Sequence, residues 1–276
     1  MIVQSAAEGQ TDGRRFVMSL DQHLELAGQF ATNFGNGAFE CPEPRKEFMY
    51  VCRWHDKGWR DFDAAPPLDP ATGLPYHLGS TPIPLMMMTS SSSPSHNEAI
   101  HPYCGLLDSM HIWGLYNGRF GYSDLVLMES VADDDKPMVE AMLDLEHRRQ
   151  KRLRAQLAAD PETAPWVEHD RLFANYKLLQ LFDTLALYFQ ATHESLRKES
   201  TFEHVPRSLN EDADVLVRPI GDGVYEVSPY PFGQNPLKVY FDGRFMTPWT
   251  GDEEPDMAAV MRNTPIERET ATLIAA

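Results

Sequence analysis

The segment NYKLLQLFDTLALYF, residues 175–189, restricts the fold of this chain more than any other feature. It is apolar nearly all round, so we expect a helix that is buried on every side. Asp183 lies within it, and an ionised carboxylate left unpaired in an apolar interior is strongly destabilising. The sequence therefore predicts a buried carboxylate that needs a cationic partner, either a metal ion, Lys177 or an arginine.

Hydrophobic spacing and end signals predict helices elsewhere in the chain. The run TSSSSPS is expected to be a loop before one of them, with Ser93 as N-cap and Pro94 at the first helical position. Residues 61–84 are rich in proline and glycine and predict a long ordered loop. The expected helices cover residues 19–35, 42–59, 95–115, 137–158 and 165–198.

After Asp212 the pattern changes to short alternating runs, VLVRPI, GVYEVSPYPF and LKVYF, separated by GDG and GQNP. Such runs are typical of strands in a hairpin or meander. We therefore expect a mainly α protein with a small C-terminal antiparallel β element. The predicted organisation is a helical domain over residues 1–212, the β element over residues 213–249 and a tail over residues 250–276, to which no function is assigned.

The net charge of −17 over 276 residues bears on the partners of the protein. Such a field repels phosphate backbones and anionic lipids, so a small-molecule substrate is expected rather than nucleic acid or a membrane, and a homo-oligomer is left open. No apolar run approaches the roughly 18 residues of a membrane span or resembles a signal peptide, which predicts a cytoplasmic protein. Three cysteines without a CxxC pair indicate neither a disulfide framework nor a thiolate zinc site.

The stretch WHDKGW, residues 54–59, places His55 and Asp56 side by side at the end of the second predicted helix. Gly58 is expected to stop that helix. Adjacent helical side chains point about 100° apart, so the pair converges on one ion only if the ion lies beside the helix. An HD dipeptide alone means little, and the flanking tryptophans are more often packing than substrate contacts.

Other predicted helices also carry histidines on apolar faces. His23 lies in the middle of the first helix, and His111 lies between Leu107 and Leu115. A single buried histidine is more often a hydrogen-bonded core residue than a ligand. Several such residues on separate buried helices are harder to explain by packing. The metal ligands that this pattern predicts are His23, His55, Asp56, His111 and Asp183.

The order His23, His55–Asp56, Asp183 resembles the H…HD…D pattern of the HD-domain superfamily, all-α metal-dependent phosphohydrolases. The resemblance implies that these residues bind one divalent ion, and that His101 and His111 help to build a second site. Mixed histidine and carboxylate ligands suit manganese, iron, zinc or nickel. Lys57 precedes Gly58, unlike the order in many of these enzymes, so their phosphate-binding lysine is not carried over.

A closer likeness covers nearly the whole chain. The stretches HDKGWRDFDAAPPLDPATGLP, LLDSMHIWGLY, NYKLLQLFDTLALYF and YPF resemble a bacterial family of unknown function with HD-like metal positions. This likeness brings no known reaction with it.

Together these features predict a metal-dependent hydrolase that acts on a phosphoester or nucleotide-like small molecule through a metal-activated water. One alternative is an HD-fold diiron oxygenase, which requires two metal ions. Another is a non-catalytic metal-containing binding module.

Residues near WHDKGW could support the chemistry. Asp61 and Asp63 could act as general base or orient a ligand, but they could equally cap the turn that follows. The proline-rich loop could cover the site, although a packed surface loop fits as well. The predicted catalytic residues are Asp56, Asp61 and Asp63, and the predicted substrate contacts are Lys57, Trp59, Arg60, Tyr76 and His77.

Overall fold

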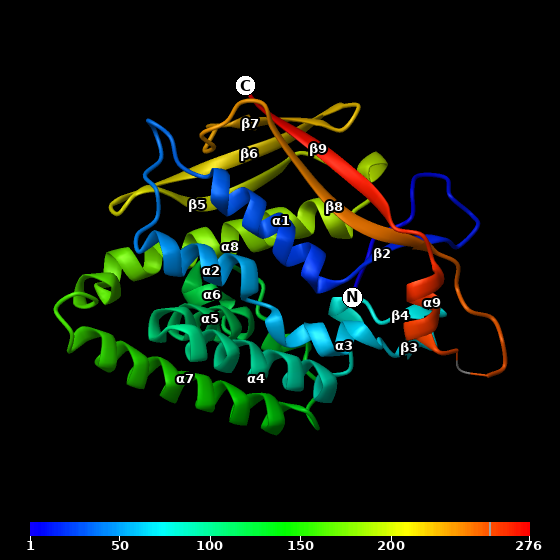
Figure 1. Ribbon diagram of the computed structural model, residues 1–276, viewed down its shortest axis with the longest axis horizontal. Helices are drawn as coiled ribbons and strands as arrows, with labels where there is room; N and C mark the ends of the chain where they lie inside the picture. Colours follow the sequence, from blue (N-terminus) through cyan, green and yellow to red (C-terminus); the bar gives the residue numbers. More distant parts are fainter. Residues whose placement is uncertain (254) are drawn as a thin grey trace.

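A computed structural model describes residues 1–253 and 255–276 as a seven-stranded sheet that packs against several helices (Figure 1). The strand order is β1-β2-β8-β9-β7-β6-β5. The sheet is mixed, because β7 and β9 are parallel and the other neighbours are antiparallel. Its strands are β1 (Ile2–Val3), β2 (Arg15–Met18), β5 (Ser200–Ser208), β6 (Glu211–Gly221), β7 (Val224–Ser228), β8 (Leu237–Met246) and β9 (Glu267–Ala275), and a separate hairpin consists of β3 (Leu68–Asp69) and β4 (Leu74–Pro75).

The helices lie mainly on one side of the sheet (Figure 1). Short 3-10 helices are η1 (Lys57–Trp59), η2 (Leu78–Ser80), η3 (Leu127–Ser130), η4 (Ala164–Val167) and η5 (Glu194–Leu196). The α-helices are α1 (Leu20–Asn33), α2 (Arg45–Trp54), α3 (Arg60–Ala64), α4 (Ile83–Ile100), α5 (Pro102–Tyr116), α6 (Gly118–Gly121), α7 (Lys136–Ala158), α8 (His169–Ala191) and α9 (Met257–Asn263).

The expectation of a mainly α protein, an HD-domain-like helical bundle with a small C-terminal antiparallel β element, is wrong, and so is the all-α fold that the resemblance implied. The sheet takes strands from both ends of the chain: β2 pairs with β8, and β9 from the predicted tail lies between β8 and β7. β1 and β2 are too short to give a periodic signal, and β2 joins the rest of the sheet through β8, where Phe16 pairs with Phe245. Ala271 and Leu273 do alternate as buried residues in β9, a signal that the sequence contained.

α8 is the buried helix that residues 175–189 predict. It packs against α1, α2 and α5 and against strand β5, so both the sheet and the helical layer cover it. Phe182, Ala186 and Phe189 are fully buried. Asp183 is consequently held between the two layers. Among the described helices none is long and apolar enough to cross a membrane.

The predicted helix 95–115 is two helices. The chain breaks at His101, because a residue before proline avoids the helical conformation, and α5 begins at Pro102. Pro94 lies inside α4 rather than at a helix start, so the prediction of a loop at TSSSSPS is wrong. Hydroxyl groups of that run bond to helix carbonyls, as Thr89 does to Met86 O at 2.8 Å. Residues 61–84, which were predicted to be a long ordered loop, contain the short elements α3, β3, β4 and η2.

Gly58 is required by a close approach rather than by helix termination. α2 already ends at Trp54, and Gly58 lies within η1. A Cβ atom at Gly58 would lie 2.1 Å from Thr89 O, and its amide donates to Ser93 Oγ at 2.9 Å. The glycine therefore lets η1 lie against α4, and this contact fixes the backbone just after His55 and Asp56.

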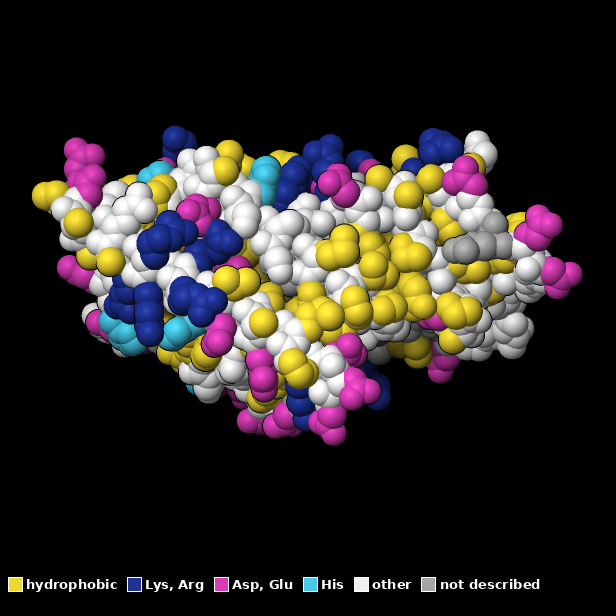
Figure 2. Space-filling model, turned by 90° about the horizontal axis from the view of Figure 1, so that it is seen from below, with side chains coloured by type: hydrophobic (Ala, Val, Ile, Leu, Met, Phe, Trp, Pro, Cys, Tyr) yellow, Lys and Arg dark blue, Asp and Glu magenta, His cyan; other side chains and the backbone are white. Residues whose placement is uncertain are grey.

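Both apolar and basic side chains gather on the face seen from below. Figure 2 shows a band of hydrophobic side chains across the middle of this face, with Lys and Arg gathered toward one end. The exposed large hydrophobic residues of the protein include Met88 on α4 and Leu125 before η3.

Candidate metal centre

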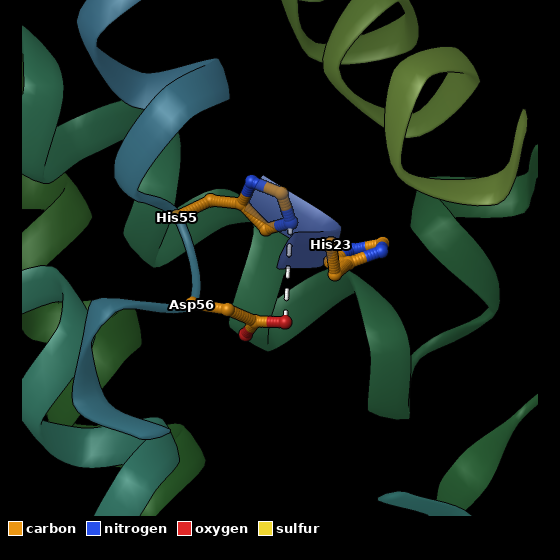
Figure 3. A group of neighbouring side chains, drawn as sticks. All are labelled: His23, His55 and Asp56. Carbon is orange, nitrogen blue, oxygen red and sulfur yellow. Dashed lines mark ion pairs between the residues drawn. The ribbon is translucent and has the colours of Figure 1, made fainter. Parts of the chain in front are cut away.

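Four side chains converge between the helices: His23 from α1, His55 and Asp56 from the chain just after α2, and Asp183 from α8. His23 Nε2 lies 3.1 Å from Asp183 Oδ1, and His55 Nε2 lies 4.0 Å from the same oxygen and 3.9 Å from Asp56 Oδ2. Each of His23, His55 and Asp56 offers one ligand atom, and these three atoms lie within 4.8 Å of one another (Figure 3). This spacing brings three or four donors within reach of one ion.

The ring of His55 is oriented as a metal ligand would be. Its Nδ1 lies 3.2 Å from Cys52 O, and a carbonyl can only accept, so Nδ1 carries the proton and Nε2 carries a lone pair. His55 is fully buried, and Nε2 has no hydrogen-bond partner within the described part of the chain. Burial lowers the pKa of His55 to about 4, so its approach to Asp56 is not an ion pair at neutral pH.

His23 is held in the same way by a glutamine. Gln190 donates from Nε2 to Gln22 O at 3.0 Å, which leaves Gln190 Oε1 to accept from His23 Nδ1 at 3.0 Å. Nε2 of His23 therefore faces the Asp183 carboxylate. Burial opposes a charge on this ring, but the carboxylate outweighs burial and raises the pKa of His23. The His23 ring and the Asp183 carboxylate attract each other only if His23 Nε2 carries a proton or a metal cation lies between the two groups.

Asp183 remains ionised although it is buried. Burial alone would raise its pKa, but the His23 hydrogen bond and the nearby His111, His23 and Arg119 hold the pKa well below its ordinary value. Arg119 reaches Asp183 Oδ2 from the other side, with its NH2 nitrogen at 3.5 Å. The centre thus joins the buried Asp183 carboxylate with the neutral imidazole of His55, and both are in the protonation state that metal ligands require.

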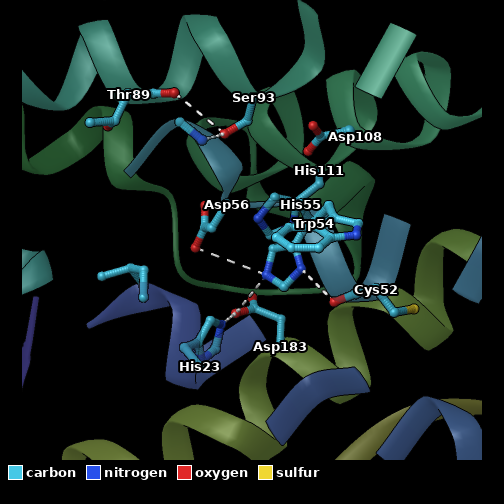
Figure 4. Close-up of polar contacts among 12 residues, drawn as sticks. His23, Cys52, Trp54, His55, Asp56, Thr89, Ser93, Asp108, His111 and Asp183 are labelled. Atoms are coloured by element: carbon cyan, nitrogen blue, oxygen red, sulfur yellow. Dashed lines mark hydrogen bonds and ion pairs between the residues drawn. The ribbon is translucent and has the colours of Figure 1, made fainter. Parts of the chain in front are cut away.

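His111 borders the cluster from α5. Its ring lies beside that of His55 (Figure 4), with 5.0 Å between the ring centroids. His111 Nδ1 lies 2.9 Å from Gln180 Nε2. Gln180 Oε1 is buried without a partner among the described residues, so the reverse amide orientation, with Oε1 accepting from Nδ1, is equally available. That orientation would leave Nε2 of His111 as a second free acceptor. Burial lowers the pKa of His111 to about 4.

Sequence reasoning missed Arg119, and the backbone around it is unusual. Gly118, Arg119, Phe120 and Gly121 all have positive φ, at 58°, 51°, 60° and 91°. A left-handed conformation costs about 1–2 kcal/mol at each non-glycine residue, so two in succession mark a constrained turn. The signal in the sequence is GRFG, an arginine and an aromatic ring between two glycines, immediately after a helix.

Sequence reasoning also missed the two glutamines that hold the histidines. Gln180 and Gln190 lie three residues before and seven residues after Asp183 on α8. These offsets place all three on one face of the helix. A polar stripe on a helix that is apolar elsewhere was visible in the sequence and indicates a buried polar site.

Two predicted site residues have structural roles away from the cluster. His101 caps α5, where its Nδ1 accepts from Tyr103 N at 3.1 Å, and its ring packs against Trp166. Asp63 accepts from the amino group of Met1 at 2.9 Å and from Leu20 N. Asp61 is exposed on α3. None of the contacts found within the described part of the chain brings these three into the cluster.

The predicted substrate contacts divide into two groups. Lys57 places Nζ 4.3 Å from the centre of the Trp54 ring, and exposed Arg60 lies 3.7 Å from Asp21, so both cations have partners elsewhere. Tyr76 is half-buried after β4. Trp59 and His77, by contrast, line a cavity that also reaches the cluster.

That cavity has a volume of about 700 Å³. At one end it is lined by Asp56, His111, Arg119 and Asp183, so a molecule inside it would meet the cluster directly. A volume of this size is within the range of about 300–1,000 Å³ that small-molecule sites occupy. The cluster therefore lies at the wall of a space suited to a ligand.

Asp108, one turn before His111, forms a second buried polar group (Figure 4). Its Oδ2 accepts from Asn97 Nδ2 at 2.7 Å, and its Oδ1 has no partner among the described residues. Burial raises the pKa of Asp108 well above its ordinary value, and the charges of Asp56 and Glu146 add to the shift. Burial therefore favours the protonated form of this carboxyl group in the folded protein.

Asp108→Asn is expected to change how stability depends on pH. Above pH about 4 the unfolded chain releases the Asp108 proton while the folded chain keeps it, so wild-type stability falls by up to about 1.4 kcal/mol per pH unit from this group. The neutral amide removes that loss. Urea unfolding at pH 5 and pH 8 is expected to show a ΔΔG in favour of the variant that grows with pH. Equal slopes, as expected for the exposed control Asp144→Asn, would contradict a protonated Asp108.

The fold and the site together define an α+β protein with a buried histidine–carboxylate cluster beside a cavity. The chain belongs to the family described as "Protein of unknown function (DUF3891)", whose model matches residues 1–247. The matched residues include the whole cluster. No curated protein and no solved structure matches the chain. The likeness to HD-domain phosphohydrolases therefore stays a prediction.

Proposed function

We propose that this protein is a metal-dependent hydrolase of a phosphoester, with His23, His55, Asp56 and Asp183 as ligands of one divalent cation. The observation that carries the proposal is the lone pair on His55 Nε2. This nitrogen is buried and without a partner in the described structure, and it faces two carboxylates. A buried acceptor surrounded by acceptors is costly unless a cation joins them.

The cation would polarise a water molecule and a phosphoryl oxygen. Asp183 has partners on both sides, whereas no hydrogen bond within the described residues engages the Asp56 carboxylate, which also lines the cavity. Asp56 is therefore the better placed group to take a proton from the attacking water. Arg119 lines the same cavity and would bind the anionic group of the substrate.

The donor set supports a single ion better than a pair. His101, one of the two histidines required for a second site, is engaged as a helix cap, and only His111 of the two remains.

The three cysteines bear on the compartment in which the protein acts. Cys52 and Cys104 are buried free thiols, and Cys41 is an exposed free thiol. Free thiols suit a reducing compartment, so we also propose that the protein acts in the cytoplasm.

A turnover screen tests the proposed activity. Protein loaded in turn with manganese, iron, zinc or nickel is expected to hydrolyse generic phosphomonoesters or phosphodiesters, and the same protein after chelation is expected to lose this activity. Complete inactivity of a stoichiometrically loaded protein across the screen would contradict the proposal.

Arg119→Ala is expected to lower kcat/KM for such a substrate by about 100-fold or more, because a charged donor that meets the developing charge is removed. The Arg119 side chain is 15% exposed, so little solvent is present to replace it. Arg148→Ala, which removes an exposed arginine from α7, is the matched control and is expected to leave kcat/KM unchanged. Equal rates for the two variants would exclude Arg119 from substrate binding.

A further inference from the structure

The cavity beside the cluster is polar at one end and apolar over most of its wall. Asp56, His111, Asp183 and Arg119 line the polar end. Most of the remaining wall is apolar and includes the side chains of Trp59, Ile83, Met86, Ile112, Leu115 and Leu187, while the polar residues His77, Ser80, Thr81, Ser90, Ser130 and Asp135 line it as well. The apolar side chains offer no partners for the hydroxyl groups and amides of a sugar or a base, and burying those groups unpaired is unfavourable.

The cavity is open to the surface at the apolar side. Leu125 is 62% exposed and still lines it, as does Leu127 in η3. A ligand that enters there passes apolar side chains before it reaches the cluster. A ligand with a longer apolar chain would bury more methylene groups against this wall, and each buried methylene adds to affinity.

The charge of the lining limits the charge of the ligand. Arg119 is the one lysine or arginine that lines the cavity within the described part of the chain. Asp56, Asp135 and Asp183 line it as well, and the whole protein carries a net charge of −17. A triphosphate or diphosphate would bring several negative charges to one arginine and one metal ion. The charge of a single anionic head group, by contrast, would be balanced by that arginine and that ion.

We infer that the ligand of this cavity is an amphiphile. Its single phosphate or phosphonate head group would lie at Arg119, and its apolar body of several carbons would lie along the apolar wall that includes Trp59, Ile83 and Leu115. The inference rests on the proposed function for the identity of the head group. It narrows the substrate class to apolar monoesters of phosphate, which are expected to bind more tightly than nucleotides.

A series of alkylphosphonates tests this inference, because these compounds cannot be hydrolysed. Methyl-, butyl- and octylphosphonate are titrated calorimetrically into the metal-loaded full chain, with adenosine monophosphate and triphosphate for comparison. Affinity is expected to rise by about fourfold per buried methylene, so the four additional methylenes of octylphosphonate are expected to make it bind about 10- to 250-fold tighter than butylphosphonate, depending on how many of them are buried. Both nucleotides are expected to bind more weakly than octylphosphonate.

Two wall variants and one control locate the effect. Leu115→Glu places a charge in the apolar wall, and Ile83→Trp fills part of its space; either is expected to remove most of the gain from butyl to octyl. Leu145→Glu changes an exposed leucine on α7 and is expected to keep the gain. Circular dichroism confirms which variants are folded, and the two different wall changes keep the test valid if one of them fails to fold.

The outcomes separate this inference from the proposed function. Equal affinities across the alkyl series, or tighter binding of a nucleotide, would overturn the inference even if the loaded protein hydrolyses simple phosphoesters. Chain-length dependence that persists in a protein unable to bind any metal would support the apolar site while the proposed hydrolase fails.

Discussion

Replacing His55 by alanine is expected to weaken the binding of a divalent cation by more than about 100-fold. Loss of an outer partner of a metal ligand already costs about 10–100-fold, and His55 would contact the ion directly. Its Nε2 has no other partner among the described residues, so the substitution removes a donor and leaves the hydrogen bonds of the other ligands intact. Competition with a chromogenic chelator measures the affinity.

His96→Ala is the matched control for this loss. His96 is a half-buried histidine on α4, and its Nε2 lies 3.2 Å from the Tyr50 hydroxyl, away from the cluster. The control is expected to bind the cation as the wild type does. If His55→Ala also keeps wild-type affinity, His55 is a packed polar residue at a helix end and not a ligand.

Asp183→Ala is expected to lower the free energy of unfolding of the metal-free protein by about 3–5 kcal/mol. Removing one partner of a buried ion pair leaves the other charge uncompensated, and Asp183 faces both His23 and Arg119. Asp183→Asn keeps the shape and one hydrogen bond, so a smaller loss is expected. Guanidinium unfolding at pH 7 measures all three proteins.

Glu226→Ala provides the comparison for an ion pair at the surface. Glu226 accepts from Arg218 at 2.6 Å, but the arginine side chain is 51% exposed, so a loss of about 0–1 kcal/mol is expected. A loss from Asp183→Ala no larger than this would mean that the cluster is not held together by charge.

The sequence was sufficient to find much of the cluster because each member breaks a local pattern. Asp183 interrupts an apolar helix and His23 lies on an apolar face, and these anomalies are visible without any knowledge of contacts. Helices α1, α7 and α8 likewise follow from spacing and end signals. The close contacts among His23, His55 and Asp183 then depend on packing that the sequence does not state.

The sheet could not be predicted in the same way. β2 pairs Phe16 with Phe245, and nothing in either short segment indicates the other. Pairing between residues so distant in sequence is a tertiary property. Arg119 escaped notice because its position depends on a left-handed turn. Asp63 lies outside the cluster, and its contact with the amino group of Met1, 62 residues away in sequence, is likewise a tertiary property.

His23, His55, Asp56 and Asp183 are proposed to share one divalent cation. Elemental mass spectrometry of the purified full chain, reconstituted with manganese, iron, zinc or nickel and then dialysed, counts the bound ions. We expect one ion per chain for at least one of these metals. No retained ion with any of them would contradict it, and the cluster would then be a hydrogen-bonded network joined by a proton on His23.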